Sequence, residues 1–142
     1  MSRPTKHAPE RGDARTRLLE AARDIIRAKG FASASVDDLC RTAAVTKGAF
    51  FHNFGSKEAL GVAAAEFWGR TTSDFFAAAA YHQPHDALER VLAYVAFRKA
   101  IITDDLADSS CLVGTMAQET FSSLPSIRDA CGAVIFWSCV NA

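Results

Sequence analysis

The chain has 142 residues, no net charge and 49% apolar residues, which is enough for one ordinary domain with a buried core. This composition excludes a disordered or fibrous protein, and no apolar segment reaches the roughly 18 to 20 residues of a membrane helix. Lys and Arg outnumber Asp and Glu by 11 to 7 in residues 1–60, but are outnumbered 5 to 9 in residues 61–142, so the N-terminal part is expected to face a polyanion.

Residues 1–13 contain two prolines, a glycine and mixed charges, and they predict a mobile N-terminal arm. The arm lacks the apolar core of a signal peptide, so a cytoplasmic protein is expected. The cysteines form no C-x-x-C pair, which indicates reduced thiols and neither a zinc site nor a disulfide framework. They are Cys40, Cys111, Cys131 and Cys139.

Helices follow the arm. Apolar residues at helical spacing, such as Leu18, Ala22 and Ile26, predict a first helix from Ala14 to a stop at Lys29-Gly30. Phe31 should then return to the core.

Two short helices and one long helix come next. Ser35 and Asp38 offer a capping box for the second helix, and Thr46 can cap a third helix over "KGAFFHNF". A long fourth helix is expected from Ser56 to about Ala80. Two short helices joined by a tight turn in front of a longer helix form a helix-turn-helix layout.

The third helix has the properties of a recognition helix. Thr46, Lys47 and Gly48 place a hydroxyl, a cation and a position without a side chain at its start, where the backbone can approach a phosphate or a base edge. Phe50 and Phe54 lie four residues apart and should face the core. Phe51 and His52 point elsewhere and are better suited to contact sugar-phosphate.

Residues 14–60 resemble the DNA-binding domain of the TetR/AcrR family of transcriptional repressors. The matching pieces are "AKGF", "SVDDLCRTAAV", "TKGAFFHNF" and "SKEAL". The resemblance implies an all-α fold, with a three-helix DNA-binding domain in residues 14–60 and a helical ligand-binding and dimerisation domain in residues 61–142. One departure is Phe51, since the family usually places a tyrosine there, whose hydroxyl reaches a phosphate.

The resemblance also implies a set of DNA contacts, most of which position the protein on DNA without reading its sequence. The set comprises Ser35, Arg41, Thr46, Lys47, Gly48, Phe51, His52 and Lys57. The alternative for Ser35, Thr46 and Ser56 is a purely structural role as helix caps. Arg3, Lys6 and Arg11 of the arm either reach adjacent DNA or belong to a solvated tail.

The C-terminal part is also predicted to be helical. Asp86 can cap a helix whose apolar face comprises Leu88, Val91, Leu92, Val95 and Ile102. His82 and His85 flank Pro84, which favours a loop, and no third ligand is evident. We therefore expect no metal and no cofactor.

The stretch "DSSCLVGTMAQETFSSLPSIRDACGAVIFW" resembles part of the ligand domain of one TetR branch, which includes electrophile-responsive members. Ser109 or Ser110 would cap its first helix and place Cys111 in the first turn, where the helix dipole favours the thiolate. Cys111 is thus a candidate sensor of electrophiles or oxidants, and a buried structural cysteine is the alternative.

A ligand pocket is expected among the fourth to seventh helices. Its candidate lining is Phe67, Trp68, Phe75, Phe97, Cys111, Met116 and Phe121. Aromatic residues at helical spacing are also typical of an ordinary core, and that alternative stays open.

After Asp129 the chain has thirteen uncharged residues and stops, whereas family members continue through two further helices that pair with a second subunit. The resemblance therefore implies a TetR-type chain that lacks its last dimerisation helices. A fragment, a natural truncation and a compact dimerising variant are the three explanations. In each of them, residues 134–137 would form an exposed apolar surface.

The sequence thus predicts a transcriptional regulator, most simply a repressor that a small molecule or a thiol-reactive signal releases from its operator. The alternative is a non-repressing interaction protein that keeps the fold and forms inactive dimers. The expected partners are a palindromic double-stranded DNA operator, a second copy of the chain and a small-molecule inducer, with no membrane. No catalytic constellation is present, so an enzyme is not expected.

Overall fold

A computed structural model describes residues 13–140 of the chain. This part consists of α-helices, one 3-10 helix and their connections, without a β-strand, which confirms the predicted all-α fold. The predicted N-terminal arm, with Arg3, Lys6 and Arg11, lies outside the described residues apart from Asp13.

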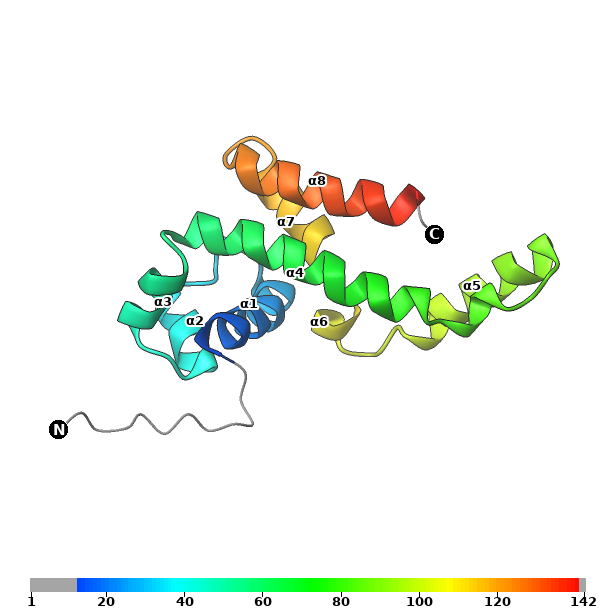
Figure 1. Cartoon of the computed structure of the whole chain (residues 1–142), viewed down its shortest axis with the longest axis horizontal. Helices are drawn as coiled ribbons and strands as arrows, with labels where there is room; N and C mark the ends of the chain where they lie inside the picture. Colours follow the sequence, from blue (N-terminus) through cyan, green and yellow to red (C-terminus); the bar gives the residue numbers. More distant parts are fainter. Residues whose placement is uncertain (1–12, 141–142) are drawn as a thin grey trace.

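The first three helices form one end of the molecule (Figure 1). They are α1 (Ala14–Lys29), α2 (Val36–Ala43) and α3 (Lys47–Asn53), and α1 packs against both of the others. Gly30 ends α1 with a φ of 86°, which glycine adopts without a side-chain clash. Phe31 then turns into the core as predicted and is 5% exposed.

Three helices begin with the predicted caps. Ser35, Thr46 and Ser56 each accept a hydrogen bond from an amide nitrogen three residues later, at 3.0, 3.1 and 3.0 Å respectively. These bonds satisfy amide groups that have no partner inside the helix. The caps explain these side chains whether or not DNA is bound.

The turn between α2 and α3 is tight and is attached to α1. Ala44 has a φ of 53°, which lies in the left-handed region, and its amide donates a hydrogen bond to the Arg41 carbonyl oxygen at 3.2 Å. The Val45 amide donates a hydrogen bond to the Cys40 carbonyl oxygen at 3.0 Å. From α1, Arg17 Nη1 donates to the carbonyl oxygens of Ala43 and Ala44 at 3.2 and 3.3 Å. The angle between α2 and α3 is therefore fixed by a side chain of α1.

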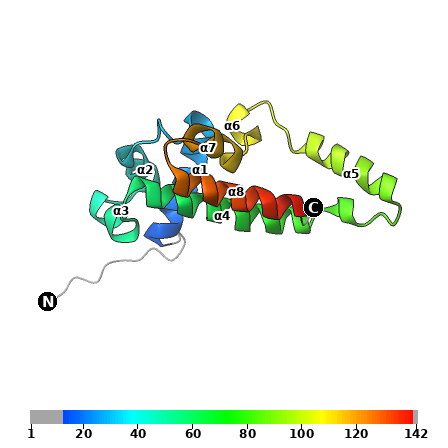
Figure 2. The same cartoon turned by 90° about the horizontal axis from the view of Figure 1, so that it is seen from above.

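The long helix α4 (Lys57–Ala77) connects the N-terminal helices to the rest of the molecule. It ends at Ala77, slightly before the predicted end near Ala80, because Ala79 has an extended backbone. The views of Figures 1 and 2 show α8 (Pro125–Val140) running beside it.

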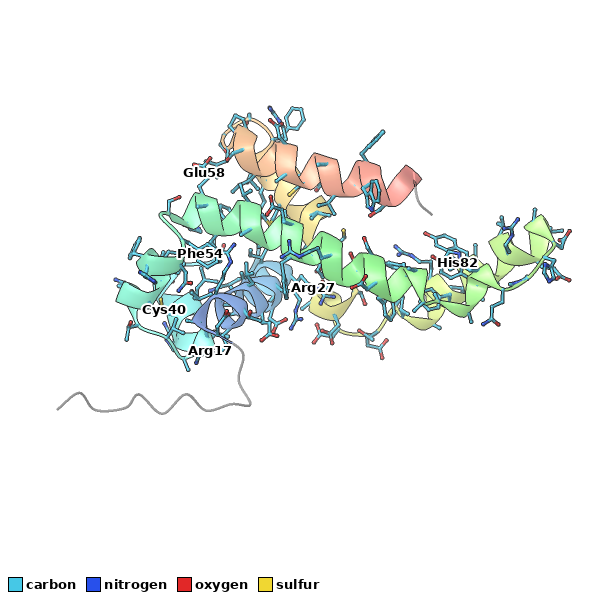
Figure 3. The ribbon with its side chains drawn as sticks, in the orientation of Figure 1. Arg17, Arg27, Cys40, Phe54, Glu58 and His82 are labelled. Atoms are coloured by element: carbon cyan, nitrogen blue, oxygen red, sulfur yellow. The ribbon has the colours of Figure 1, made fainter. Side chains whose placement is uncertain are left out.

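Glycines on α4 permit this close packing. A Cβ atom added at Gly61 would lie 2.7 Å from Ile127, and one at Gly69 would lie 3.0 Å from Val134. Near the start of both helices the Ser126 hydroxyl donates to Glu58, which Figure 3 labels. Small residues on α4 thus set the distance at which α8 can pack.

The hydrophobic core is one continuous cluster that joins α1, α2, α3 and α4 to α8. It includes α7 (Leu112–Thr120), which packs against α8, α1 and α4. The largest fully buried side chains are Leu18, Ile26, Leu39, Phe50, Leu60, Leu112, Met116, Ile127 and Cys131. The helix-turn-helix unit and the C-terminal helices therefore share one core.

The helix α5 (Ala87–Ala100) projects from the end of the molecule opposite α3 (Figure 1). Its Asp86 cap is present, with the Glu89 amide 3.0 Å from the carboxylate. It packs on the 3-10 helix η1 (Ala80–His82), and Phe97 contacts aromatic rings of α4. The predicted apolar face is exposed in the described structure, with exposures from 49% to 66% for Leu88, Val91, Leu92, Val95 and Ile102.

Replacing Ala44 with valine should destabilise the protein by about 1 to 2 kcal/mol, because a β-branched side chain clashes in the left-handed region. Ala44→Gly is the matched control, since it removes the Cβ atom and should retain the wild-type stability or exceed it. Urea unfolding followed by circular dichroism measures both variants. Equal unfolding midpoints for the valine variant and the wild type would contradict this account of the turn.

Candidate DNA-binding surface and ligand cavity

One face of α3 is buried and the other is open to solvent. Phe50 is fully buried and Phe54 is 3% exposed, which confirms that both belong to the core. Lys47, Gly48, Phe51 and His52, together with the cap residue Thr46, are exposed. Positions three and four apart along a helix share a face, which places Lys47 beside Phe51 and Gly48 beside Phe51 and His52. We call this exposed set, with Thr46, the α3 surface.

The start of the α3 surface leaves room for another molecule. Thr46 Oγ1 is engaged with the Ala49 amide, and a Cβ atom added at Gly48 would meet only that oxygen, at 3.7 Å. Gly48 is therefore not required by the packing of the described chain. Its missing side chain leaves the backbone open to close approach.

Lys47 forms an ion pair with Asp37 of α2, with Nζ 3.0 Å from the carboxylate. The pair raises the pKa of Lys47 through this hydrogen bond and the charge of Asp37. Both side chains are more than 60% exposed, and such pairs are weak because water and salt screen them. Lys47 can therefore exchange Asp37 for a phosphate at small cost.

Phe51 is 53% exposed and its ring lies edge-on to Phe50, with the centroids 5.1 Å apart. His52 is also exposed, next to Phe51 on the α3 surface. The aromatic ring thus presents an apolar face beside an imidazole that can donate a hydrogen bond.

Of the predicted contacts at α2, Ser35 is engaged as its N-cap and Arg41 forms an exposed ion pair with Asp38. The Arg41 side chain is 75% exposed, with one nitrogen 3.1 Å from Asp38. Asp38 also accepts a hydrogen bond from Lys29 at 2.7 Å. This bond is the largest cause of the lowered pKa of Asp38, which is about 2, and a hydrogen bond with Ser35 is the second cause. The carboxylate is therefore ionised at neutral pH and pairs with Arg41 one turn further along the same helix.

Lys57 differs from the other predicted DNA contacts because the protein already binds it. Its Nζ donates to the Ala32 carbonyl at 3.3 Å and lies 4.5 Å from the centroid of the Phe31 ring. Partial burial lowers the pKa of Lys57. Contact with a phosphate would require this side chain to leave Phe31.

A cavity of about 950 Å³ lies among α4, η1, α5, α8 and the short helix α6 (Leu106–Ser109). Of the predicted pocket residues, Trp68, Phe75 and Cys111 line it. Phe97 packs against Phe75 at 5.6 Å, and it does not itself line the cavity.

The other predicted pocket residues lie elsewhere. Met116 is fully buried in the core, and Phe67 packs against that core. Phe121 is 67% exposed, with the Arg128 guanidinium 5.8 Å from its ring centroid. Sequence spacing identified these side chains as apolar, but only the packing of α4 and α7 in the folded chain decides which of their side chains face the cavity.

Several lining residues were not predicted from the sequence. The aromatic ones are Phe76, Tyr81, Tyr94 and Trp137, and the cationic ones are Arg27 and Arg98. Phe76 could have been predicted from the sequence, since it follows Phe75 directly. Arg27 could not have been predicted, because it belongs to the last turn of α1 and reaches the cavity only in the folded chain.

Arg27 connects α1 to the wall of the cavity. Its Nε donates to the Ser110 carbonyl at 3.1 Å, its Nη2 donates to the Asp108 carbonyl, and its guanidinium lies 5.1 Å from the Trp68 ring centroid. The Ser110 hydroxyl in turn donates to the Arg27 carbonyl at 3.2 Å. Figure 3 labels Arg27 at the end of α1, next to α4.

Glu119 of α7 forms a second connection to α1. Its carboxylate accepts hydrogen bonds from the amides of Phe31 at 2.7 Å and Ala32 at 3.4 Å. A Cβ atom added at Gly30 would lie 2.6 Å from the Glu119 carboxylate. The turn after α1 therefore depends on a side chain more than eighty residues away in sequence.

Cys111 occupies a different position from the one predicted. It is the N-cap residue of α7 instead of a first-turn residue, and Ser110 is bonded to Arg27 and to Ala107 of α6. The reason is that the segment forms two short helices with a break at Ser110 and Cys111. Cys111 is exposed, whereas Cys131 is fully buried and its pKa is raised to about 11 by burial.

The two histidines near η1 do not meet a third ligand. His82 Nε2 lies 3.0 Å from the Phe76 carbonyl, and residues 13–140 contain no group of three His, Cys, Asp or Glu side chains suited to a metal ion. None of the helices in the described part is long and apolar enough to cross a membrane.

Comparison with known proteins identifies the N-terminal helices. Residues 18–64 match the family described as bacterial regulatory proteins, tetR family. The HTH-type transcriptional regulator UidR of Escherichia coli K12 is 50% identical over 46 residues, which are 32% of this chain and 24% of UidR. The HTH-type transcriptional repressor NemR of Escherichia coli K12 is 30% identical over 139 residues, which are 92% of this chain and 63% of NemR.

Solved structures agree with this relationship. The reduced form of Escherichia coli NemR superposes with a TM-score of 0.71 at 27% identity, over 87% of this chain and 64% of NemR. A TetR family regulator from Agrobacterium tumefaciens shares the fold, with a TM-score of 0.73 at 20% identity over 86% of this chain and 63% of that one.

The chain therefore spans less than two thirds of the length of the curated relatives it matches. These relatives are transcriptional regulators and not enzymes, as the sequence led us to expect. Together with the helix-turn-helix geometry of α1 to α3, the matches show that residues 18–64 form a domain of the tetR family of bacterial regulatory proteins, and that the chain resembles regulators of this family over most of its length.

Proposed function

We propose that this protein is a DNA-binding transcriptional repressor that contacts its operator through the α3 surface. The observation that supports this most strongly is the division of α3 into a buried face with Phe50 and an exposed face with Lys47, Gly48, Phe51 and His52. A short helix that exposes a cation and open backbone at its start suits the major groove. In this proposal residues 14–60 bind DNA and residues 61–142 regulate that binding.

Dimerisation is part of the proposal. Phe136 of α8 is 70% exposed and lies outside the cavity lining, and the exposed surface of α8 around such a large apolar side chain is a candidate contact with another protein. A second copy of the chain on this surface would present two α3 surfaces to two half-sites, about one helical turn or more apart. The same surface also supports the alternative of an inactive mixed dimer with a related chain.

Selection from a pool of randomised DNA duplexes tests the function directly. The full chain should enrich a palindromic sequence, because two copies related by a two-fold axis read two inverted half-sites. Enrichment of single half-sites would favour a monomer, and a pool that stays random after repeated rounds would remove the proposed function.

Lys47→Ala should weaken binding to a mixed-sequence duplex and should reduce the slope of log affinity against log salt by about 1, because one phosphate contact is lost. Asp37→Asn should strengthen binding, since it removes the carboxylate that pairs with Lys47 and repels phosphate. Fluorescence anisotropy across a salt series measures both effects.

The matched control for Lys47→Ala is Lys99→Ala, which removes an exposed lysine from α5 at the opposite end of the molecule. If Lys47→Ala and Lys99→Ala reduced affinity and salt slope equally, the α3 surface would not be the DNA contact.

The regulatory signal is proposed to enter through the cavity and to reach α1 through Arg27. Cys111 lines the cavity next to Ser110, whose carbonyl accepts from Arg27. A molecule in the cavity, or a group added to Cys111 Sγ, would displace the corner between α6 and α7 and with it the end of α1. Since Arg17 of α1 fixes the turn of the helix-turn-helix, the displacement would alter the setting of α3.

Alkylation with N-ethylmaleimide tests this route. The Cys111 sulfur adds across the maleimide double bond and the thiol proton is transferred to the neighbouring carbon. We expect alkylation to lower DNA affinity in a chain carrying Cys139→Ser, and to have no effect once Cys111→Ser is added. Arg27→Gln should leave alkylation intact but reduce its effect on DNA affinity.

Mass spectrometry confirms the extent and site of modification in each variant. A full loss of DNA affinity on alkylation of the Arg27→Gln chain would show that the signal takes another route. An unchanged affinity after complete modification of Cys111 would place the sensor elsewhere.

A further inference from the structure

We infer that the cavity binds an aromatic organic anion, and that Arg98 on α5 is the residue that binds its carboxylate or sulfonate group. The inference rests on the proposed function for the regulatory meaning of the cavity, while the binding itself requires no DNA. It concerns the chemical class of the ligand.

Aromatic side chains form much of the cavity wall. Trp68, Phe75 and Phe76 come from α4, and Tyr81 and Tyr94 lie across from them on η1 and α5. The two tyrosine rings meet edge-on, with their centroids 5.2 Å apart. Walls of this kind favour a planar apolar body, and a cavity of about 950 Å³ accommodates one.

Arg98 introduces a positive charge into this aromatic wall. Its guanidinium lies 5.1 Å from the Phe76 ring centroid and 5.8 Å from that of Tyr94. Among the described side chains it has no carboxylate within ion-pair distance. Contacts with ring faces leave the N–H groups along the edge of the guanidinium available, and these match a carboxylate in a two-point geometry.

The other charges of the lining do not compete for this role. Arg27 also faces the cavity, but two of its three guanidinium nitrogens, Nε and Nη2, donate to the carbonyls of Ser110 and Asp108. Asp108 supplies the one carboxylate among the described lining residues, against two arginines. His82 is engaged with the Phe76 carbonyl. The cavity therefore has an excess of positive charge, with Arg98 as the available cation.

Other ligand classes fit these residues less well. Aromatic walls alone would suit a quaternary ammonium ion, but the charge of Arg98 in the same wall repels a cation. A neutral apolar molecule would fill the space without using the guanidinium. An anion with an aromatic body satisfies both the rings and Arg98.

Two dyes with the same ring system test the inference on the full chain. 1-Anilinonaphthalene-8-sulfonate carries a sulfonate, and N-phenyl-1-naphthylamine lacks it. Fluorescence titration should show roughly tenfold or tighter binding of the sulfonate, because a charge-assisted hydrogen bond to arginine is lost in the neutral dye. Arg98→Gln should remove this preference and leave the affinity for the neutral dye unchanged.

Two variants of α5 serve as matched controls. Arg90→Gln removes a cation from the same helix outside the cavity lining and should retain the preference for the sulfonate. Leu92→Ser reduces the exposed apolar face of α5 and should also leave sulfonate binding unchanged, since Leu92 does not line the cavity. Energy transfer from Trp68 and Trp137 to the bound dye should accompany binding, because both tryptophans line the cavity.

Equal affinities for the two dyes, equal effects of Arg98→Gln and Arg90→Gln, or loss of sulfonate binding in Leu92→Ser would each overturn the inference. DNA affinity measured on the same samples separates it from the proposed function. If the dye experiment fails while the chain still binds DNA, only the proposed ligand class is refuted. If the dye results are as expected but the chain does not bind DNA, the proposed repressor function is refuted.

Discussion

The position of α1 is the constraint on which the rest of this structure depends. Its N-terminal half is bonded through Arg17 to the turn that sets α3 against α2. Its C-terminal end is bonded through Arg27 to the corner between α6 and α7, and Glu119 fixes the turn that follows. The proposed DNA contact and the cavity are therefore attached to opposite ends of one rigid helix, and a change at one end has a short physical route to the other.

Much of the N-terminal half could be predicted because the bonds that define it are local. Ser35, Thr46 and Ser56 each cap a helix through an amide three residues away, and the spacing of Phe50 and Phe54 fixes which side of α3 is buried. Such features depend on the sequence within one or two turns. The helix bounds and the exposed residues of α3 follow from them.

The cavity could not be predicted in the same way because distant segments form it. Met116 and Phe121 are apolar residues of the same region, yet one is fully buried and the other is 67% exposed. Arg27 belongs to a charged face of α1 in the sequence and still reaches Trp68. The break at Ser110 and Cys111, which moves Cys111 to the N-cap, depends on bonds between Ser110 and Arg27 that only the folded chain can form.

The central claim is that the α3 surface meets DNA, and amide chemical-shift mapping tests it most directly. An isotope-labelled full chain would be titrated with duplex DNA while the amide signals are followed by NMR. The account predicts that the largest shifts fall on residues 46–52, followed by smaller shifts at the end of α1 where Arg27 lies. Shifts confined to α5 or α8, with residues 46–52 unchanged, would contradict it.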